Sequence, residues 1–360
     1  MKRLDLNSQS MSSVIADTVA VLKAGGLVVY PTETTYGLGV DATNPVAVNK
    51  LLKYKSRRQG KPLSIAVSNP QMAEKFVAIN HQAQAIYSSL LPGPVTIVSK
   101  GLGKVAPGVE SEFGSLGVRW SSFPLVTNIL EAFGQPITAT SANASGKARP
   151  YSIDRLLDRL STHQKSLIGL VLDAGKLPKN PPSTVIDTTL STPVVMRAGG
   201  TKIDVKQNIV TESENETKQL AGKIVLKHLN DLTNTGLVIG LDGELGTGKT
   251  IFAKGVAQFL QINQPITSPT YTYINQYNFS RHQTQGTFYH IDAWKVDQPE
   301  LTQKLEIESL LKPNNVLVIE WFDQLSDYLE PIINTKGVEL VRIAVSDDGL
   351  ANSKRIFKIL

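Results

Sequence analysis

The sequence predicts two α/β domains in one chain. Both halves alternate short, apolar, β-prone runs with segments of helical periodicity; the runs include GLVVYP, LSIAV and VTIVS in the first half and LVIGL and VLVIEW in the second. A length of 360 residues suffices for two domains that each bury a core of their own. In the second half a glycine-rich loop follows one of the apolar runs directly, as in nucleotide-binding α/β domains.

The boundary between the domains is expected near residues 201–206. There a Gly-Gly turn leads into a polar stretch, and Ser213 with Glu216 fits a capping box at the start of a new helix. The short run NIVT before this helix is a candidate first strand of the second domain. We therefore predict one domain over residues 1–203 and another over residues 207–360, joined by a short connector.

Composition excludes several classes of protein. There is no cysteine, so disulfides and thiolate metal sites are ruled out, and a reducing compartment fits. The five histidines show no zinc-type spacing. The start, MKRLDLNSQSMSS, lacks an apolar leader, and no apolar run has the length of a membrane span. We expect a cytoplasmic protein that makes no membrane contact.

The net charge of +6 is unevenly distributed. Residues 1–205 hold 22 Lys and Arg against 13 Asp and Glu, or +9, whereas residues 206–360 hold 15 against 18, or −3. An excess confined to one half favours a polyanionic partner for that half, such as a nucleotide or RNA. A basic surface that serves only solubility would give the same count.

The stretch LVIGLDGELGTGKT is the most informative in the chain. A buried strand over residues 237–241 would lead into a loop whose glycines let backbone N–H groups converge on a β-phosphate. Lys249 supplies a charge for the β- and γ-phosphates, and the Thr250 hydroxyl can bind magnesium. Helix formers follow at once, so the phosphates would lie at a helix N-terminus. The alternative is a glycine-rich turn that matches the pattern by chance, but such a turn would not require a strand before it and a helix after it. The loop glycines are Gly243, Gly246 and Gly248.

Three further segments of the second half end in polar residues. ITSPTYTYINQY contains a Ser-Pro-Thr turn, FYHIDAWKV places His290 and Asp292 at a strand end, and VLVIEW ends in Glu320 and Trp321. A carboxylate at the end of a buried strand beside a phosphate loop is the usual way to hold magnesium through water, and Asp292 is placed to orient or deprotonate an attacking water. Taken singly, each acid fits a solvated strand end or a helix cap equally well.

Together with the segment ELTQKLEIESLL, these motifs resemble the TsaE (YjeE) family of small ATPases that serve tRNA threonylcarbamoylation. The resemblance covers nearly all of residues 206–360 and implies a P-loop NTPase-like α/β domain. It implies that Lys249 and Thr250 bind phosphate and magnesium, and that Asp292 and Glu320 are the essential acids, with Glu320 also at the metal. It further places Thr270 in a switch-like loop and Trp321 against nucleotide or a partner.

The first half offers hydroxyls and cations. VVYPTETTYGLGVDA runs from a strand into a hydroxyl-rich turn, and TATSANASG and PPSTVIDTT add two more such turns. LLKYKSRRQGKPL is basic, GVRW contributes Arg119, and VVMRAGG contributes Arg197. There is no candidate nucleophile–His–Asp set, so the pattern favours phosphate and carboxylate binding with electrostatic catalysis. The basic cluster alone fits a solvated turn or an RNA-facing patch equally well.

The motifs PTETTYGLG, KSRRQGKPLS, LPGPVTIV, GVRW, SANASG, PSTVID and MRAGG resemble the YrdC/TsaC family over roughly residues 10–200. That family makes threonylcarbamoyl-AMP and pyrophosphate from L-threonine, bicarbonate and ATP, on a twisted α/β sheet with a concave, positively charged face. The resemblance implies catalytic roles for Lys55 and Arg57. It assigns to the substrate site Thr32, Thr35 and Tyr36 near threonine, Ser183, Thr184 and Arg197 at ATP, and also Lys61, Arg119, Ser141 and Asn143.

The two resemblances together imply a natural fusion for the biosynthesis of threonylcarbamoyladenosine in tRNA. The first half would make the adenylate; the second would hydrolyse ATP, with Mg²⁺, to support a TsaB–TsaD-type transferase. ATP would be a substrate at both sites, and the basic first half is a candidate tRNA contact. One alternative makes the first half a non-catalytic RNA-binding module that recruits tRNA to the ATPase. Another makes the second half a small-molecule kinase, although no arginine-rich lid is apparent.

Overall fold

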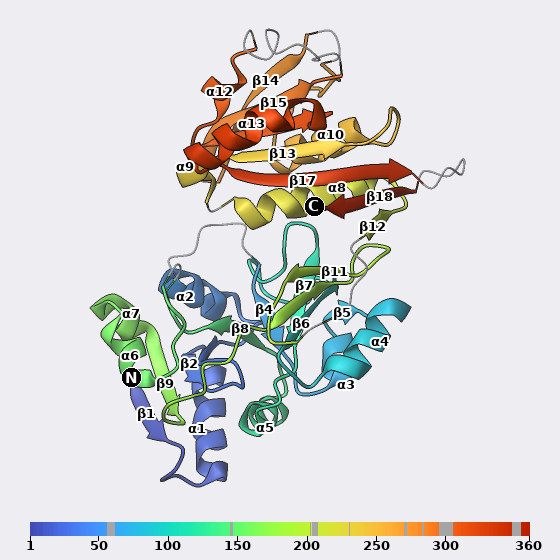
Figure 1. Cartoon of the computed structure of the whole chain (residues 1–360). Coiled ribbons are helices and arrows are strands. Elements are labelled where there is room, and N and C mark those ends of the chain that lie inside the picture. Colours follow the sequence, from blue (N-terminus) through green and yellow to red (C-terminus); the bar gives the residue numbers. More distant parts are fainter. Residues whose placement is uncertain are drawn as a thin grey trace. The chain divides into compact units, whose positions relative to one another are not determined.

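The computed structural model of the chain describes residues 1–55, 62–144, 147–201, 203, 208–229, 231–269, 272–282, 284–294, 305–347 and 354–360. The chain divides into two compact units (Figure 1). One comprises Met1–Thr189 and Pro193–Val205, and the other comprises Leu190–Thr192 and Lys206–Leu360. Both are α/β, as the sequence predicts. Within the described ranges no helix is long and apolar enough to cross a bilayer.

The first unit is built on a mixed sheet whose described strands run in the order β1-β9-β2-β3-β8-β4-β7-β6-β10-β11, with β5 beside β6. Its strands are β1 (Lys2–Asp5), β2 (Leu27–Tyr30), β3 (Gly37–Gly39), β4 (Ser64–Ala66), β5 (Val77–Ala78), β6 (Val95–Gly101), β7 (Ser115–Arg119), β8 (Ile137–Ser141), β9 (Ile168–Asp173), β10 (Thr184–Asp187) and β11 (Val194–Arg197). Its helices are α1 (Met11–Lys23), α2 (Pro45–Lys55), α3 (Pro70–Glu74), α4 (His81–Leu90), α5 (Pro124–Phe133), α6 (Ile153–Asp158) and α7 (Thr162–Leu167).

The strand order brings motifs from distant parts of the sequence side by side. Strand β3 pairs with β8, so Gly37 lies opposite Ser141, and β4 pairs with β7, so Ala66 lies opposite Arg119. Strand β6 pairs with β10, which sets Thr184 opposite Val95. The hydroxyl-rich turns and the arginines therefore meet at neighbouring strand ends of one sheet.

Apolar burial fixes this arrangement. All four residues of β2 are buried, and α1 and α5 pack against each other beside the sheet. Helix α2 is held to the end of β8 by Tyr54, whose buried hydroxyl donates to the carbonyl of Ala142 at 2.6 Å. A buried hydroxyl needs such an acceptor, so this bond sets the position of the helix end that carries Lys55.

The second unit has a sheet in the order β12-β18-β17-β13-β16-β15-β14. The described strands are β12 (Asn208–Thr211), β13 (Leu237–Asp242), β14 (Ile274–Arg281), β15 (Thr284–Asp292), β16 (Asn315–Glu320), β17 (Glu339–Asp347) and β18 (Arg355–Ile359). The helices are α8 (Glu214–His228), α9 (Leu232–Thr235), α10 (Lys249–Phe259), α12 (Ile307–Leu310) and α13 (Asp323–Lys336). Ser213 caps α8 as predicted, accepting from the backbone N–H of Glu216, but the carboxylate of Glu216 accepts from the N–H of Glu212 and not from that of Ser213, so the predicted capping box is only half formed.

The central strands β17, β13, β16 and β15 are parallel, so their carboxyl ends share one edge of the sheet. In register, Leu241 lies opposite Glu320, and Glu320 lies opposite Asp292. Strands β13 and β16 are buried throughout, as expected for strands covered on both faces. Ligands of open α/β sheets bind outside this carboxyl edge.

Close packing at the centre of β13 leads to a test of the second fold. A Cβ added at Gly240 would lie 2.5 Å from Cγ of the buried Phe322. Phe322 immediately precedes α13 and is fully buried, so its ring cannot move away from the added methyl group. Gly240→Ala should therefore destabilise this unit by about 1–3 kcal/mol. Urea unfolding followed by tryptophan fluorescence measures the change. An unchanged midpoint would show that the ring and strand are not packed as described.

Candidate functional site

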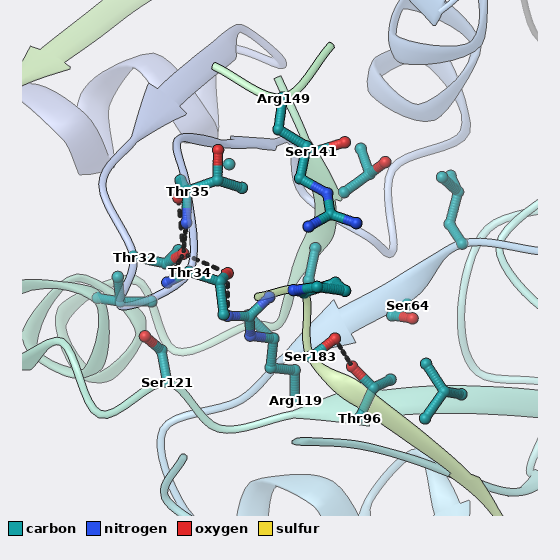
Figure 2. Close-up of a pocket in the computed structure, with 18 of the residues that line it drawn as sticks. Thr32, Thr34, Thr35, Ser64, Thr96, Arg119, Ser121, Ser141, Arg149 and Ser183 are labelled. Atoms are coloured by element: carbon teal, nitrogen blue, oxygen red, sulfur yellow. Dashed lines mark hydrogen bonds between the residues drawn. The ribbon is translucent and has the colours of Figure 1, made fainter. Parts of the chain in front are cut away.

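A cavity of about 250 Å³ opens in the first unit where the strand ends meet (Figure 2). Hydroxyls and guanidinium groups supply its polar lining, and no carboxylate is among the described residues that line it. Figure 2 shows Arg119 and Arg149 extending between the threonine turn on one side and the Ser183–Thr96 pair on the other. The polar side chains lining the cavity are Thr32, Thr34, Thr35, Ser64, Thr96, Arg119, Ser121, Thr140, Ser141, Arg149, Ser183 and Arg197.

The threonine turn after β2 is held by its own first hydroxyl. The hydroxyl of Thr32 accepts from the backbone N–H groups of Thr34 and Thr35, each at 3.2 Å, and donates to the carbonyl of Thr35 at 2.7 Å. The hydroxyl of Thr35 donates to the carbonyl of Pro150. A turn closed by side-chain hydrogen bonds is rigid, so the hydroxyls have fixed positions at the cavity wall.

Arg119 is fixed by a carboxylate that the sequence interpretation did not single out. Its Nη2 donates to Oε1 of Glu33 at 2.6 Å and to Oγ1 of Thr34 at 2.7 Å, and the hydroxyl of Ser121 donates to the other carboxylate oxygen. Both charged side chains are largely buried, with 14% and 16% exposed. The Nε of Arg119 is buried and has no hydrogen-bond partner within the described part of the chain. A ligand acceptor in the cavity would satisfy it.

Three arginines gather around the cavity. The Arg197 guanidinium donates to the carbonyl of Ser183 at 2.9 Å and to its hydroxyl at 2.8 Å. Partial desolvation, and then the positive charges of Arg149 and Arg119, lower the pKa of Arg197. Like charges held this close repel one another in the ligand-free protein, and a bound anion would relieve this repulsion.

The packing around Arg197 requires the first glycine of the MRAGG motif, Gly199. A Cβ at Gly199 would lie 2.3 Å from the carbonyl oxygen of Pro182 and 2.4 Å from the backbone nitrogen of Thr184. Only glycine therefore allows the segment after β11 to approach the PPST turn closely enough for Arg197 to reach Ser183.

Lys55 lies beside the cavity rather than in its lining. It is 4% exposed, and its ammonium donates to the carbonyls of Ser141 at 2.5 Å and Asn143 at 2.7 Å. The lysine thus joins the end of α2 to the turn after β8. Oδ1 of Asn143 is buried and, as far as the described chain extends, has no partner, which leaves an acceptor for a ligand donor.

Asn143 lines a second cavity instead, and two further predicted residues also lie outside the lining of the first. Tyr36 is fully buried. Its hydroxyl donates to the carbonyl of Gly175 at 2.7 Å and accepts from the N–H of Ala174 at 2.9 Å. Thr184 is 1% exposed and donates to the carbonyl of Thr201. Arg57 and Lys61 lie outside the described residues.

A second cavity, of about 360 Å³, adjoins the first, because Arg149 lines both. Its charged lining is entirely basic among the described residues, and Tyr151 supplies an aromatic side chain. The basic residues are Lys147, Arg149, Arg155, Arg159, Lys176 and Lys179. Six basic residues of the first half therefore gather beside the first cavity.

In the second unit the glycine-rich loop joins β13 to α10, as predicted. Gly243, Gly246 and Gly248 have φ of 151°, 85° and 102°, values that favour glycine. A Cβ at Gly243 would lie 1.9 Å from the carbonyl oxygen of Val345, and one at Gly248 would lie 2.5 Å from Cδ and Nε of Arg355. Strands β17 and β18 thus support the loop, and Arg355 lies against it. The loop motif alone could not predict this contact, because Arg355 lies far along the chain.

Lys249 begins α10 and turns back over the loop. Its ammonium donates to the carbonyls of Gly243 and Glu244, both at 2.7 Å, and lies 4.1 Å from the ring centroid of Trp321. Burial lowers the pKa of Lys249, while the nearby carboxylates of Glu320, Asp292 and Asp242 oppose this effect. Trp294 packs on Trp321, with ring centroids 4.3 Å apart.

The acids at the sheet edge converge on this loop. Glu320 is 4% exposed, and its Oε1 accepts from the hydroxyl of Thr250 at 2.9 Å and lies 2.8 Å from Nε2 of His290. Asp292 is 5% exposed and accepts from the backbone N–H of Trp294 at 3.0 Å and, more weakly, from the Ser268 hydroxyl at 3.4 Å. Thr270 lies outside the described residues.

The donor set at this edge fits magnesium. Thr250 and Glu320 present oxygen atoms only, and their contact places a hydroxyl and a carboxylate at one point beside the loop lysine. Mg²⁺ prefers such hard oxygen ligands, keeps several waters and uses few protein carboxylates. Within the described ranges, no group of three or more His, Asp or Glu side chains could hold a metal ion.

The family model of the Sua5, YciO and YrdC proteins, described as "Telomere recombination", matches residues 20–199. The model for TsaE, described as "Threonylcarbamoyl adenosine biosynthesis protein TsaE", matches residues 211–354. A threonylcarbamoyl-AMP synthase from Photobacterium profundum is 34% identical over 158 residues, which cover 43% of this chain and 85% of that protein.

Two solved structures show a similar fold. E. coli YciO has a TM-score of 0.51 at 25% identity and covers 56% of this chain and 97% of its own. A P. abyssi Sua5 complexed with L-threonine has a TM-score of 0.51 at 18% identity and covers 95% of this chain and 98% of its own. At that identity the second likeness shows the fold alone.

The hydrogen bonds of the Tyr36 hydroxyl predict that this residue stabilises the first unit rather than contacting substrate. Tyr36→Phe would remove the hydrogen-bond partner of the Gly175 carbonyl and of the Ala174 N–H, neither of which is fully buried, so the first unit should lose about 0.5–1.5 kcal/mol of stability. Denaturant unfolding of the purified chain measures this loss. A variant of wild-type stability that required much more L-threonine for saturation would instead favour a direct contact with substrate.

Proposed function

The chain belongs to the Sua5, YciO and YrdC family, and we infer that its first unit joins L-threonine, bicarbonate and ATP into threonylcarbamoyl-AMP and pyrophosphate. The observation that carries this conclusion is the cavity itself. Three guanidinium groups and a ring of fixed hydroxyls face one space, and no carboxylate lines it among the described residues. Such a surface binds a triphosphate and a carboxylate at the same time.

The chemistry needs cations more than a strong base. The threonine amine takes up bicarbonate with loss of water and forms a carbamate, which is already an anion. A carbamate oxygen then attacks the α-phosphorus of ATP; the new O–P bond forms as the bond to the β-phosphate oxygen breaks, and pyrophosphate leaves with the electron pair. Charge grows on the leaving group, so fixed positive groups stabilise the transition state.

The arginines have separable roles in this scheme. Arg119 is held by Glu33 and Thr34 on the side of the threonine turn, so it is placed to receive the threonine carboxylate. Arg197 contacts Ser183, and Arg149 also lines the basic second cavity, which supports a role for both at the phosphates. Lys55 orders the turn that carries Ser141 and Asn143, and its ammonium adds positive charge beside the cavity.

The second unit is an ATPase that serves threonylcarbamoyladenosine biosynthesis. Its loop glycines, Lys249 and the helix N-terminus surround the phosphates. Thr250 and Glu320 would hold Mg²⁺, which supplies charge neutralisation between the phosphates when bound. Asp292, at the neighbouring strand end, is placed to orient the attacking water.

The partners follow from this pairing of activities. The adenylate made by the first unit needs a transferase that places the threonylcarbamoyl group on tRNA, and a TsaB–TsaD-type complex is the partner that the ATPase would serve. The basic second cavity, with Tyr151 beside six cations, supports direct tRNA contact. Because both activities are on one chain, the local concentration of the adenylate near the transferase would be higher.

Pyrophosphate release separates the two sites. With ATP, Mg²⁺ and bicarbonate, wild type should release pyrophosphate only when L-threonine is present. Lys55→Ala should lower this rate about 100-fold or more, because it removes a charge and frees the turn at Ser141. Lys249→Ala is the matched control, since it removes a loop-bound lysine of the other unit and should leave the rate unchanged.

The same assay distinguishes the alternative function. Release that does not depend on threonine, or that is lost equally in Lys55→Ala and Lys249→Ala, would contradict an autonomous synthase in the first unit. The first unit would then be better explained as an RNA-binding module.

A further inference from the structure

His290 is a buried titratable group that the proposed mechanism does not use. It lies near the end of β15, is fully buried, and is opposite Val318 of β16 and Asn275 of β14 in register. Its ring stacks near Phe288, with centroids 6.4 Å apart, so the ring plane is fixed by packing. A fully buried imidazole must find partners for both nitrogens.

Both ring nitrogens have oxygen partners from different elements. Nε2 lies 2.8 Å from Oε1 of Glu320, and Nδ1 lies 3.2 Å from the carbonyl oxygen of Thr267. A carbonyl oxygen only accepts, so Nδ1 donates to Thr267. A carboxylate oxygen also only accepts, so Nε2 donates to Oε1 of Glu320, the same oxygen that accepts from Thr250, and the three side chains are joined by hydrogen bonds.

Thr267 lies in the segment that joins α10 to β14, just before Ser268. Its carbonyl also accepts weakly from Nδ2 of Asn275 at 3.3 Å, and the hydroxyl of Ser268 reaches Asp292 at 3.4 Å. The shorter contact, to His290, is part-buried, whereas the contact to Asn275 is exposed. A single ring thus connects this segment to the carboxylate beside the loop threonine.

We propose that His290 is a positioning residue of the nucleotide site. Through Nε2 it holds the Glu320 carboxylate beside Thr250, and through Nδ1 it anchors the segment at Thr267. The inference rests on the ATP site proposed for the second unit. Groups that orient a metal-binding carboxylate typically change metal affinity by about 10–100-fold when they are removed.

The two contacts can be separated by two substitutions. The amide nitrogen of asparagine takes the place of Nδ1, so His290→Asn keeps the contact with Thr267 and loses the one with Glu320. The amide nitrogen of glutamine takes the place of Nε2, so His290→Gln keeps Glu320 and loses Thr267. Asn315→Ala is the matched control, because it removes a buried hydrogen bond, to the carbonyl of Leu310, at the opposite end of β16.

The first readout is binding of the fluorescent nucleotide mant-ADP to the full chain as Mg²⁺ is titrated. His290→Asn should raise the Mg²⁺ concentration for half-maximal binding about 10- to 100-fold, and His290→Gln should change it less than about threefold. Asn315→Ala should lower thermal stability without changing the Mg²⁺ requirement. Equal effects of both His290 variants, or none, would overturn the proposal.

The second readout needs no nucleotide. Hydrogen exchange at the amides of residues 266–268 should be faster in His290→Gln than in His290→Asn. If neither variant folds, Glu320→Ala decides the question, because removing the acceptor of Nε2 should also loosen the ring and speed exchange at Thr267; unchanged exchange would overturn the proposal. Failure of wild type to bind mant-ADP would instead contradict the proposed ATP site, while the exchange readout still tests the anchor at Thr267.

Discussion

Both units depend on one kind of contact: a buried lysine whose ammonium donates to two backbone carbonyls of a neighbouring turn. Lys55 is held in this way by Ser141 and Asn143, and Lys249 by Gly243 and Glu244. Each lysine is only 4% exposed. A carbonyl carries a partial charge, so these contacts satisfy the ammonium protons and order the turn while most of the positive charge remains for a phosphate.

The surroundings of the two lysines then decide what each site does. Near Lys55 the further groups are hydroxyls and the arginines 119, 149 and 197, which suit two anionic substrates and a leaving group that gains charge. Near Lys249 the further groups are Glu320, Asp292 and Thr250, which suit a metal ion and a positioned water. In the proposed scheme the first arrangement joins a carbamate to AMP, and the second hydrolyses ATP.

The sequence predicts a site well where its residues are close together in the chain, and poorly where they come from distant segments. The phosphate loop is continuous, so strand, glycines, Lys249 and helix could all be placed from one stretch. Glu33, Arg149 and Arg355 could not be assigned, because their contacts depend on strand order or on a segment far along the chain. Tyr36 was assigned to the substrate with its neighbour Thr35, yet the two side chains leave the turn in different directions, one to the cavity wall and one into the core. His290 was noticed but had no role until the sheet placed it between Glu320 and Thr267.

The most direct test of the account is the identity of the product. The full chain would be incubated with ATP, Mg²⁺, L-threonine and ¹³C-bicarbonate, and the nucleotides would be separated at once and analysed by mass spectrometry. The account predicts an AMP adduct that carries threonine and one ¹³C atom. Threonyl-AMP without ¹³C, or AMP and ADP alone from an otherwise active chain, would contradict a carbamate as the attacking group and with it the central claim.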